Sequence, residues 1–423
     1  MKLATSATIV ALLTIGVIRW PSPTEARGES ATRAQAPVAV EIPTFQWDPA
    51  WSKTMPNNWM LGATIGAHVD SRDHIWIVHR SFGNGTGAPS AYQAAADQTP
   101  PVAECCRAAP PVVEVDRAGN LVQGWGGPGS GYEWPEGEHG IFVDHKDNVW
   151  IGSNFAGQRG GSSRISTQVL KFTRQGKFLL QIGKEGVLGT NDDHQNMKQP
   201  TGIWVDAATN EAFVADGELQ DHRRVIVFDA DTGAYKRHWG AYGNTPMDGD
   251  LGRYAPGDKP EQFRGPHCVR MSRDGLLYVC DRFNDRLQVF RKDGTFVKEI
   301  FVAPSTLYPG SVYDVAFSPD AEQKSLYVAD GMNKKVWILL RESLEVLDRF
   351  GVGGNFGGQF NHPHSIAADS AGNLYVTETL EGKRVQKFTF TGMKTAVPLP
   401  PPPQPRQTPR LTTTLTSTRR HRQ

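Results

Sequence analysis

The sequence has no excess of charge of either sign. Its 423 residues include 45 lysines and arginines against 44 aspartates and glutamates. Proteins that bind nucleic acid or an anionic membrane surface through charge carry a basic excess or a basic patch. We therefore expect neither nucleic acid nor a membrane surface among the partners of this protein.

Cysteine is also scarce, with four residues in the chain. Cys105 and Cys106 are adjacent in a predicted loop and fit free thiols as well as a bond. Cys268 and Cys280 flank a predicted hairpin centred near Asp274 and would face each other across it. No second Cys or His pair has the spacing of a structural zinc site, which argues against metal ligation by the cysteines. Four cysteines fit an oxidising compartment without requiring one.

Long apolar runs are missing beyond the N-terminus. Lys2 precedes an apolar run from Ala7 to Ile18, and Thr24-Glu25-Ala26 provides a small-residue cleavage site, as in a secretory signal peptide. The run is short for a membrane span, and no other segment is long enough. We predict a signal peptide over residues 1–26 and a secreted or periplasmic protein. An uncleaved N-terminal anchor is the alternative.

The remaining sequence divides into a linker, a folded region and a tail. Residues 27–40 are a polar linker, and residues 394–423 are a Pro- and Thr-rich tail that we predict to be disordered. Residues 41–393 remain for the folded domain. The many Gly (44), Pro (29) and Trp (11) residues favour an all-β fold with many turns.

An internal repeat fills the folded region. The first half of each unit is an apolar strand, a turn and a second apolar strand, as in GIFVDHKDNVWIGSN and SIAADSAGNLYVTET. The second half is another hairpin, as in LQVFRKDGTFVKEIF. Six units of about four strands each predict a single six-bladed β-propeller. Two β-sandwich domains are the alternative, disfavoured by the regular period.

The sixth unit begins as RVQKFTFTG and then lacks its last strand. The segment from Ile42 to Trp47 precedes the first unit and is available to supply that strand. This pairing would close the ring and remove exposed sheet edges. We therefore predict that the two ends of the domain meet in the last blade.

One position of the repeat carries the strongest chemical signal. At the first strand of each unit, this slot is occupied in chain order by Ile65, His139, Thr201, His267, Tyr313 and His364. First strands line the channel of a propeller, so the three histidines would lie roughly 120° apart around the axis. Three neutral imidazoles with an open fourth position are typical of catalytic zinc, whereas Mg²⁺ and Ca²⁺ prefer oxygen ligands. In the alternative, each histidine bonds only channel water or nearby backbone.

These residues resemble those of a known family. The segments PHCVRM and PHSIAAD, with IWIVHR in the first unit, are similar to the NHL-repeat propeller of peptidyl-α-hydroxyglycine α-amidating lyases, from about Trp59 to Phe390. The resemblance implies that His139, His267 and His364 hold a zinc ion. It also implies cleavage of a peptide ending in α-hydroxyglycine to a peptide amide and glyoxylate.

The resemblance extends to two arginines and breaks at two other positions. Arg80, in the motif Val-His-Arg, and Arg282, in CDRFNDRLQ, match active-site arginines of the family. Glu218 stands where the family has a tyrosine that acts as a base or stabilises charge. Ser365 stands where the family has an aspartate of a structural calcium site, which weakens the expectation of Ca²⁺ here.

The chemistry of such a site suggests roles for these side chains. A tri-histidine zinc lowers the pKa of a bound hydroxyl, and an arginine fork suits a carboxylate. A substrate with a hydroxyl beside a carboxylate would satisfy both. Arg80 and Arg282 are the arginine candidates, unless each only braces neighbouring blades.

Two residues are candidates for the catalytic base. Glu218 is one, if partial burial raises its pKa; alternatively it is an exposed loop carboxylate paired with Arg223 or Arg224. Tyr313 occupies the slot between two histidines and is the other candidate, with a channel-lining aromatic as its alternative role.

A zinc-dependent carbon–nitrogen lyase acting on a small peptide or hydroxyglycine-like substrate is the function that the sequence favours. A metal-assisted hydrolase or lactonase is one alternative. A non-catalytic propeller that binds a peptide or protein partner over its face is another. We expect a monomer.

Overall fold

The computed structural model describes residues 39–51, 53–81, 90, 93–154, 156–159, 162–218, 222–252, 254–396 and 399. All of them belong to one compact unit that begins at residue 38. The predicted signal peptide, nearly all of the predicted linker and the tail beyond residue 399 lie outside the described residues.

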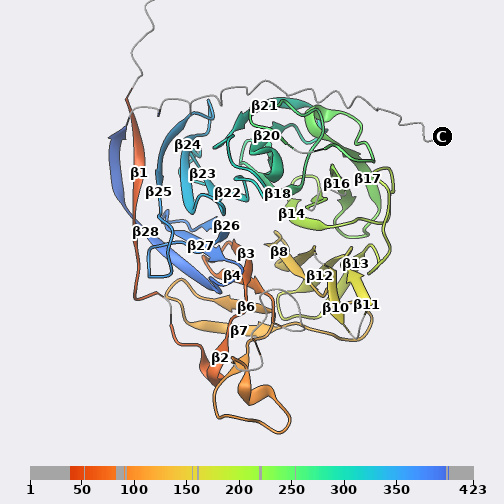
Figure 1. Cartoon of the computed structure of the whole chain (residues 1–423), viewed down its shortest axis with the longest axis vertical. Helices are drawn as coiled ribbons and strands as arrows, with labels where there is room; N and C mark the ends of the chain where they lie inside the picture. The colour runs from red at the N-terminus through yellow and green to blue at the C-terminus, as the bar shows by residue number, and fades with distance from the viewer. Residues whose placement is uncertain are drawn as a thin grey trace, which may run out of the picture. The chain divides into compact units, whose positions relative to one another are not determined.

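Four-stranded antiparallel sheets, one for each sequence repeat, make up this unit. From the innermost to the outermost strand, blade one contains β3 (Thr64–Val69), β4 (Ile75–His79), β6 (Val112–Val115) and β7 (Leu121–Trp125), and blade two contains β8 (Glu138–Val143), β9 (Asn148–Ser153), β12 (Val169–Thr173) and β13 (Phe178–Ile182). In the same order, blade three contains β14 (Pro200–Asp206), β15 (Glu211–Asp216), β16 (Arg224–Asp229) and β17 (Tyr235–Trp239), and blade four contains β18 (Pro266–Met271), β19 (Leu277–Asp281), β20 (Arg286–Phe290) and β21 (Phe296–Phe301). Blade five contains β22 (Asp314–Phe317), β23 (Ser325–Asp330), β24 (Lys335–Leu340) and β25 (Val346–Phe350), and blade six contains β26 (Pro363–Ala368), β27 (Leu374–Glu378), β28 (Arg384–Ala396) and β1 (Val40–Trp47). Figure 1 shows β3, β8, β14, β18, β22 and β26 around the middle of the unit. The predicted all-β six-bladed propeller is confirmed.

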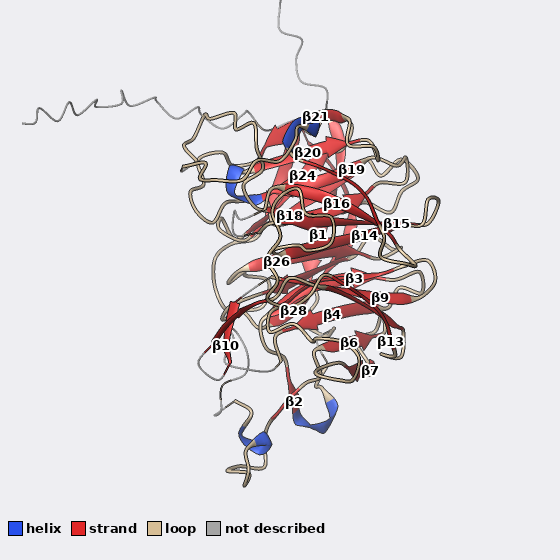
Figure 2. Cartoon of the chain, turned by 90° about the vertical axis from the view of Figure 1, so that its right-hand side faces the viewer, coloured by secondary structure: helices blue, strands red, loops and turns tan. Residues whose placement is uncertain are grey.

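Few elements lie outside the blades. β2 (Trp59–Met60) pairs in parallel with β5 (Arg107–Ala108), and β10 (Ala156–Arg159) pairs with β11 (Ser162–Ile165). The helices of the described residues are short 3₁₀ turns, η1 (Pro56–Asn58), η2 (Ala95–Asp97), η3 (Ala241–Gly243) and η4 (Arg282–Asn284), and strands dominate the side view in Figure 2. None of these helices is long and apolar enough to cross a membrane.

An aspartate at the first turn helps to explain why the repeat folds into hairpins. In blade two, Asp144 accepts the backbone N–H of Asn148 at 2.9 Å and the indole N–H of Trp150 at 2.9 Å. Asp70 and Asp369 make corresponding contacts in blades one and six. A carboxylate that accepts nearby backbone N–H groups stabilises a tight turn, and its second oxygen satisfies the buried aromatic side chain of the next strand.

The N-terminal strand closes the ring. β1 pairs antiparallel with β28, from Val40 opposite Ala396 to Trp47 opposite Phe388. The prediction that the segment before the first repeat completes the last blade is thereby confirmed. β28 continues three residues beyond the expected domain end at residue 393, because β1 offers ladder partners as far as Ala396.

Apolar layers between neighbouring blades hold the ring together. In the described residues each adjacent pair of blades shares a buried hydrophobic cluster. Trp76 and Phe172 lie in the layer between blades one and two, and Ile77 and Tyr375 lie in the layer between blades six and one. The seam between the last and first blades therefore has a buried apolar layer like those between the other blades.

The cysteines are all bonded in this structure. Cys268 and Cys280 lie opposite each other in the β18–β19 ladder, as predicted, and form a disulfide with a Cα–Cα distance of 4.9 Å. Cys105 and Cys106 are also joined.

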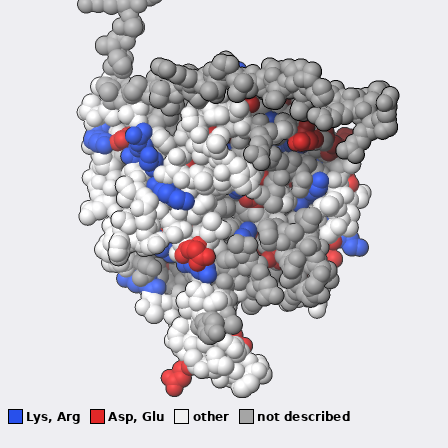
Figure 3. Space-filling view, in the orientation of Figure 1, with Lys and Arg blue, Asp and Glu red and all other residues white. Residues whose placement is uncertain are grey.

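Figure 3 shows acidic and basic side chains interspersed on the face in view, in keeping with the balanced composition.

Candidate metal centre

Three histidines from alternate blades meet on the axis. His139 lies in β8, His267 in β18 and His364 in β26, each at the second residue of its innermost strand. Their ring centroids form a nearly equilateral triangle with sides of 4.7, 4.8 and 4.9 Å. All three side chains are buried. The repeat therefore brings its one recurrent histidine position to a single point.

Backbone carbonyls of the other three blades orient the rings. The Nδ1 atoms of the histidines lie 3.2 Å from the Thr201 carbonyl oxygen, 2.6 Å from that of Tyr313 and 2.7 Å from that of Ile65. A carbonyl only accepts, so each Nδ1 carries the proton and donates it. In a neutral ring Nε2 then carries the lone pair, and the Nε2 atoms of His139 and His267 are buried without a hydrogen-bond partner. Imidazoles oriented in this way are typical metal ligands.

The protonation state suits metal binding. Burial lowers the pKa of His267 to about 4 and holds the pKa of His364 well below its ordinary value. Neighbouring positive groups, Arg282 among them, add to the effect. Both rings are therefore neutral near pH 7, which is the form that ligates a metal.

The close spacing of the strands depends on Gly140. A Cβ atom at this position would collide with the Thr201 carbonyl oxygen, the same atom that accepts the hydrogen bond from His139. Any larger residue would push blade three away from the ring of His139. Glycine is therefore required for a close backbone approach at this point.

Buried carboxylates at the ends of second strands hold the loops that lead into the slot. Asp281 accepts the backbone N–H of Arg264 at 2.6 Å, and Glu378 accepts that of His362 at 3.2 Å. Asp216 accepts the N–H of Gln199 at 3.0 Å in blade three. Each of these loops reaches its slot residue within three positions, so the carboxylates fix where the axial side chains start.

Glu218 lies beside the triad and is buried. Its carboxylate oxygens are 3.5 Å from Nε2 of His139 and 3.6 Å from Nε2 of His267. Nη1 of Arg282 donates to Oε1 at 2.6 Å, and the amide of Asn154 donates to Oε2. The alternative in which Glu218 is an exposed loop carboxylate paired with Arg223 or Arg224 is wrong.

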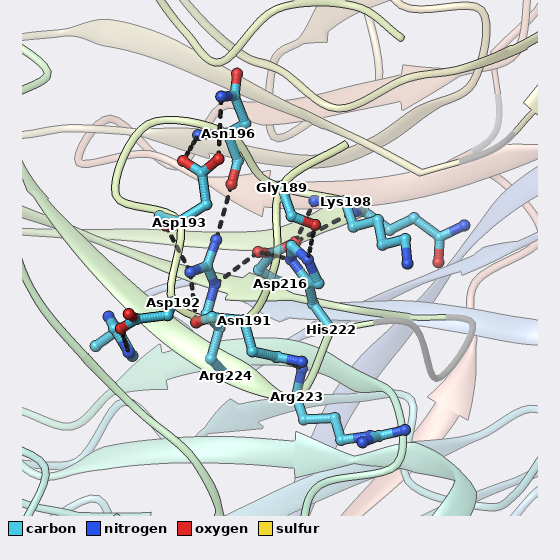
Figure 4. Close-up of polar contacts among 12 residues, drawn as sticks. Gly189, Asn191, Asp192, Asp193, Asn196, Lys198, Asp216, His222, Arg223 and Arg224 are labelled. Atoms are coloured by element: carbon cyan, nitrogen blue, oxygen red, sulfur yellow. Dashed lines mark hydrogen bonds and ion pairs between the residues drawn. The ribbon is translucent and has the colours of Figure 1, made fainter. Parts of the chain in front are cut away.

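The chain around Glu218 is held by its neighbours. Asp216 at the end of β15 accepts from Nδ1 of His222 at 2.7 Å and from Nε of Arg224 at 3.0 Å. Figure 4 shows these contacts and the loop around Asp193 that Arg224 also holds. Gly217 has a φ of 134°, which a non-glycine residue rarely adopts. Glu218 thus follows a rigid strand end and turns at once toward the axis.

Glu218 is negatively charged in this environment. Burial by itself would raise the pKa of its carboxyl, but the nearby His139 and Arg282 outweigh burial and hold that pKa well below the ordinary value. Glu218 is expected to act as a base if partial burial raises its pKa, but here the pKa shifts in the opposite direction.

The two predicted arginines reach the same carboxylate by different routes. Arg282 begins η4, and its Nε also donates to the Pro309 carbonyl at 3.0 Å. Arg80 follows β4, and its Nη2 donates to the Asn154 side-chain oxygen at 3.1 Å. Asn154 therefore connects Arg80 to Glu218. Both arginines bridge blades and face the centre, so the two predicted roles are compatible.

Tyr313 packs between the triad and Arg282. The Arg282 guanidinium lies 4.6 Å from the centroid of the tyrosine ring, and the Tyr313 hydroxyl is 3.2 Å from Nε2 of His362. Burial raises the pKa of Tyr313 to about 12. The phenol is therefore neutral near pH 7, and its contacts suit a residue that positions Arg282.

Four side chains offer donor atoms for one ion. The donor atoms of His139, Glu218, His267 and His364 all lie within 4.8 Å of one another. A buried cluster of nitrogen donors with two unpartnered Nε2 atoms fits a transition metal. The part of the channel below the triad does not fit a second cation in the same way, because Asp314 already accepts from Arg270 at 2.8 Å and from Ser365 at 2.6 Å.

Comparison with known proteins supplies relatives. A model of the NHL repeat matches residues 263–290 and 360–388, the segments that contain His267 and His364. Peptidyl-glycine alpha-amidating monooxygenase B of Xenopus laevis is 29% identical over 258 residues, covering 59% of this chain and 26% of the relative. Peptidyl-alpha-hydroxyglycine alpha-amidating lyase 1 of Drosophila melanogaster is 23% identical over 407 residues, covering 89% of this chain and 65% of the relative. The chain is an NHL-repeat propeller related to the amidating lyases.

This NHL propeller spans about a quarter of the Xenopus relative and just under two thirds of the Drosophila relative. Among solved structures, a streptogramin B lyase has a TM-score of 0.45 at 11% identity, covering 84% of this chain and 98% of that one.

The NHL propeller gathers the predicted site residues around one centre. Each of them lies in the triad or within two contacts of it: His139, His267, His364, Glu218, Arg282, Arg80 and Tyr313. Sequence reasoning missed Asn154, which links Arg80 to Glu218. It follows β9 without any motif of its own, so only the three-dimensional arrangement identifies it.

Proposed function

We propose that this NHL propeller is a zinc-dependent lyase that cleaves the C–N bond of a peptidyl-α-hydroxyglycine-like substrate to give an amide and glyoxylate. The observation that carries the proposal is the set of three buried imidazoles that face one point beside the Glu218–Arg282 pair. The names of the Xenopus and Drosophila relatives describe α-amidating enzymes, which supports this substrate class.

His139, His267 and His364 would hold the ion through their Nε2 atoms. Zinc in such a site supplies a Lewis acid that lowers the pKa of a substrate hydroxyl. Neutral imidazoles favour zinc over Mg²⁺ and Ca²⁺, which prefer oxygen. The carbonyl partners of Nδ1 keep the three rings in the orientation that ligation needs.

Arg282 and Arg80 would bind the substrate carboxylate. In the resting site Arg282 donates directly to the Glu218 carboxylate, and Arg80 reaches it through Asn154. The planar guanidinium of an arginine matches a substrate carboxylate in two hydrogen bonds. Tyr313 keeps the Arg282 guanidinium in place against its ring.

Glu218 would carry the proton from the hydroxyl oxygen to the leaving nitrogen. As the O–H bond breaks, its electron pair becomes the second C–O bond of glyoxylate. The electron pair of the C–N bond leaves with the nitrogen, which takes the proton, so no water or oxidant is consumed. When Arg282 moves to the substrate carboxylate, Glu218 loses a partner that lowers its pKa and becomes a better base.

The direct test is incubation of the purified, zinc-loaded protein with a dansylated peptidyl-α-hydroxyglycine. We expect release of glyoxylate together with the dansylated amide. His267→Ala is expected to abolish the release, whereas His68→Ala, a channel histidine outside the triad, keeps it. A zinc-loaded protein without turnover would contradict the proposal and favour a hydrolase, a lactonase or a binding protein.

The proposal includes export from the cytosol as a monomer. The predicted signal peptide and the Cys268–Cys280 disulfide support an oxidising compartment. Cell fractionation with N-terminal sequencing of the mature chain tests the export, and light scattering tests the monomer.

A further inference from the structure

We infer that Glu218 is a fourth protein ligand of the metal, so that the resting site is closed by three histidines and one carboxylate. This inference rests on the proposed metal site and deepens it. It differs from a base role, because a ligand affects how tightly the ion is held and a base affects only turnover.

The distances around Glu218 are those between ligands of one ion. Metal–ligand bonds of about 2.0–2.1 Å in a tetrahedron place neighbouring donor atoms about 3.4 Å apart. The carboxylate oxygens of Glu218 lie 3.5 Å and 3.6 Å from Nε2 of His139 and His267. These two nitrogens have no hydrogen-bond partner, which is expected of atoms that share an ion with the carboxylate.

The partners of Glu218 leave its inner lone pairs free for a metal. A carboxylate has about four acceptor positions, and Arg282 and Asn154 each occupy one of them. Arg282 is fixed by the Pro309 carbonyl and Asn154 by Arg80. Carboxylate ligands are commonly held by such outer hydrogen bonds, which set their direction.

A carboxylate in this position also stands where a ligand carboxylate would bind. The Glu218 oxygens occupy the space between the triad and Arg282, which is the place for the acid group of an α-hydroxy or α-keto acid. Such a ligand has to take over Arg282 and displace Glu218. Glu218 therefore lowers the affinity of the resting site for small carboxylates, glyoxylate included.

The experiment compares Glu218→Gln with the wild type and with Glu211→Gln. Glu211 lies at the opposite end of β15 and makes a two-pronged ion pair with Arg237 at 2.8 and 2.7 Å. The control thus removes a carboxylate from an arginine partner in the same blade, away from the triad. Co²⁺ serves as the probe metal, because its visible spectrum reports coordination. Its affinity is measured by competition with a chelator, and glyoxylate is then titrated into the loaded proteins.

We expect Glu218→Gln to lose at least tenfold in Co²⁺ affinity, since loss of even an outer-shell partner costs about 10–100-fold. Its Co²⁺ spectrum changes, and its Co²⁺-loaded form binds glyoxylate more tightly than the wild type. Glu211→Gln matches the wild type in all three measurements. Glu218→Asp keeps the charge on a shorter side chain and is expected to weaken Co²⁺ binding too, so it carries the test if the glutamine variant does not fold.

The outcomes separate this inference from the proposed function. Unchanged Co²⁺ affinity and spectrum in Glu218→Gln, with loss of glyoxylate release alone, would show a base that is not a ligand and overturn the inference only. A wild-type protein that binds no Co²⁺ or Zn²⁺ overturns both.

Discussion

The two ends of the axial strands are built from the same repeat but differ in chemistry. At the triad end, His139, His267 and His364 direct their Nε2 atoms to one point. Three residues further along the strands, at the aromatic end, the ring of His68 lies 4.6 Å from that of Phe142, and Phe142 lies 4.6 Å from Trp204. The triad end therefore brings nitrogen donor atoms together, whereas at the aromatic end an imidazole packs against aromatic rings.

The comparison shows which feature of a buried histidine indicates a metal. Desolvation and the charge of Arg270 lower the pKa of His68 to about 3, so this ring is as neutral as those of His267 and His364. Neutrality and burial are therefore shared by both ends. What distinguishes the triad is three Nδ1 atoms fixed by carbonyls and Nε2 atoms that converge beside a carboxylate.

Between the two ends the channel is almost filled. Arg270, Asp314 and Ser365 bond to one another there, and the remaining space beneath the triad is about 10 Å³. That volume is at the limit for a single water molecule. A ligand of the triad has to arrive from the side of Glu218 and Arg282.

The strongest way to break this comparison is to exchange histidine for alanine at each end. His267→Ala is expected to retain less metal than the wild type, because one imidazole is removed and only two imidazoles and Glu218 remain. His68→Ala is expected to keep one metal per chain. Metal analysis of both purified proteins, with circular dichroism as a check of folding, measures the difference. Equal metal content in the two variants would contradict the distinction between the ends.

The next effect concerns packing at the aromatic end. Phe142→Ala removes a buried ring that contacts His68 and Trp204, and such truncations cost about 3–5 kcal/mol. We expect a loss of that order in the free energy of unfolding, measured by denaturant titration. The metal content should stay at the wild-type level, and Phe142→Leu should lose less. A Phe142→Ala variant that loses its metal but keeps its free energy of unfolding would contradict this prediction.

A smaller effect is expected from the two channel arginines. Arg282→Lys keeps the charge but loses the planar fork, so we expect about a tenfold rise in KM for the peptidyl-α-hydroxyglycine, equivalent to about 1.4 kcal/mol. Arg270→Lys, beneath the triad, is expected to leave KM unchanged. Steady-state kinetics of both variants test this. A rise in KM for Arg270→Lys but not for Arg282→Lys would contradict this prediction and place the substrate carboxylate beneath the triad, beside Arg270.

The smallest effect separates two buried carboxyl groups near the triad end. Glu218 is ionised, whereas burial raises the pKa of Asp285, which follows η4, to about 9. The unfolded chain ionises this group above about pH 4, so folding becomes less favourable as the pH rises from about 4 to about 9. Asp285→Asn removes this dependence and should stabilise the metal-free protein at pH 8 by about 1 kcal/mol or more, but not at pH 4. Thermal unfolding at both pH values tests the prediction, and a variant that is less stable at pH 8 would contradict it.

The ring itself was predictable because its signals are local and repeated. Each unit carries its own alternation of apolar residues and its own turn, such as that around Asp144. The position of β1 could be inferred because blade six lacked a strand. The slot histidines followed from the same alignment, since equal positions in repeats point in equivalent directions.

The environment of Glu218 could not be predicted in the same way. Its partners Asn154 and Arg282 come from blades two and four, and no repeat relates these three residues. Sequence suggested Arg223 or Arg224 because they are near in the chain. The structure instead uses Arg224 to hold Asp216, since a buried carboxylate at a strand end needs a partner of its own.

The seam of the ring has a consequence for biosynthesis. The third imidazole, His364, is oriented by Ile65, and the Thr64 hydroxyl donates to the Glu378 carbonyl at 2.9 Å across the same seam. His139 and His267 are translated long before His364, so a nascent chain holds at most two of the three imidazoles. Full metal affinity then arises only after the last blade has docked on the first. An ion retained through purification would indicate a finished ring, and chains that end before His364 would hold the ion less tightly.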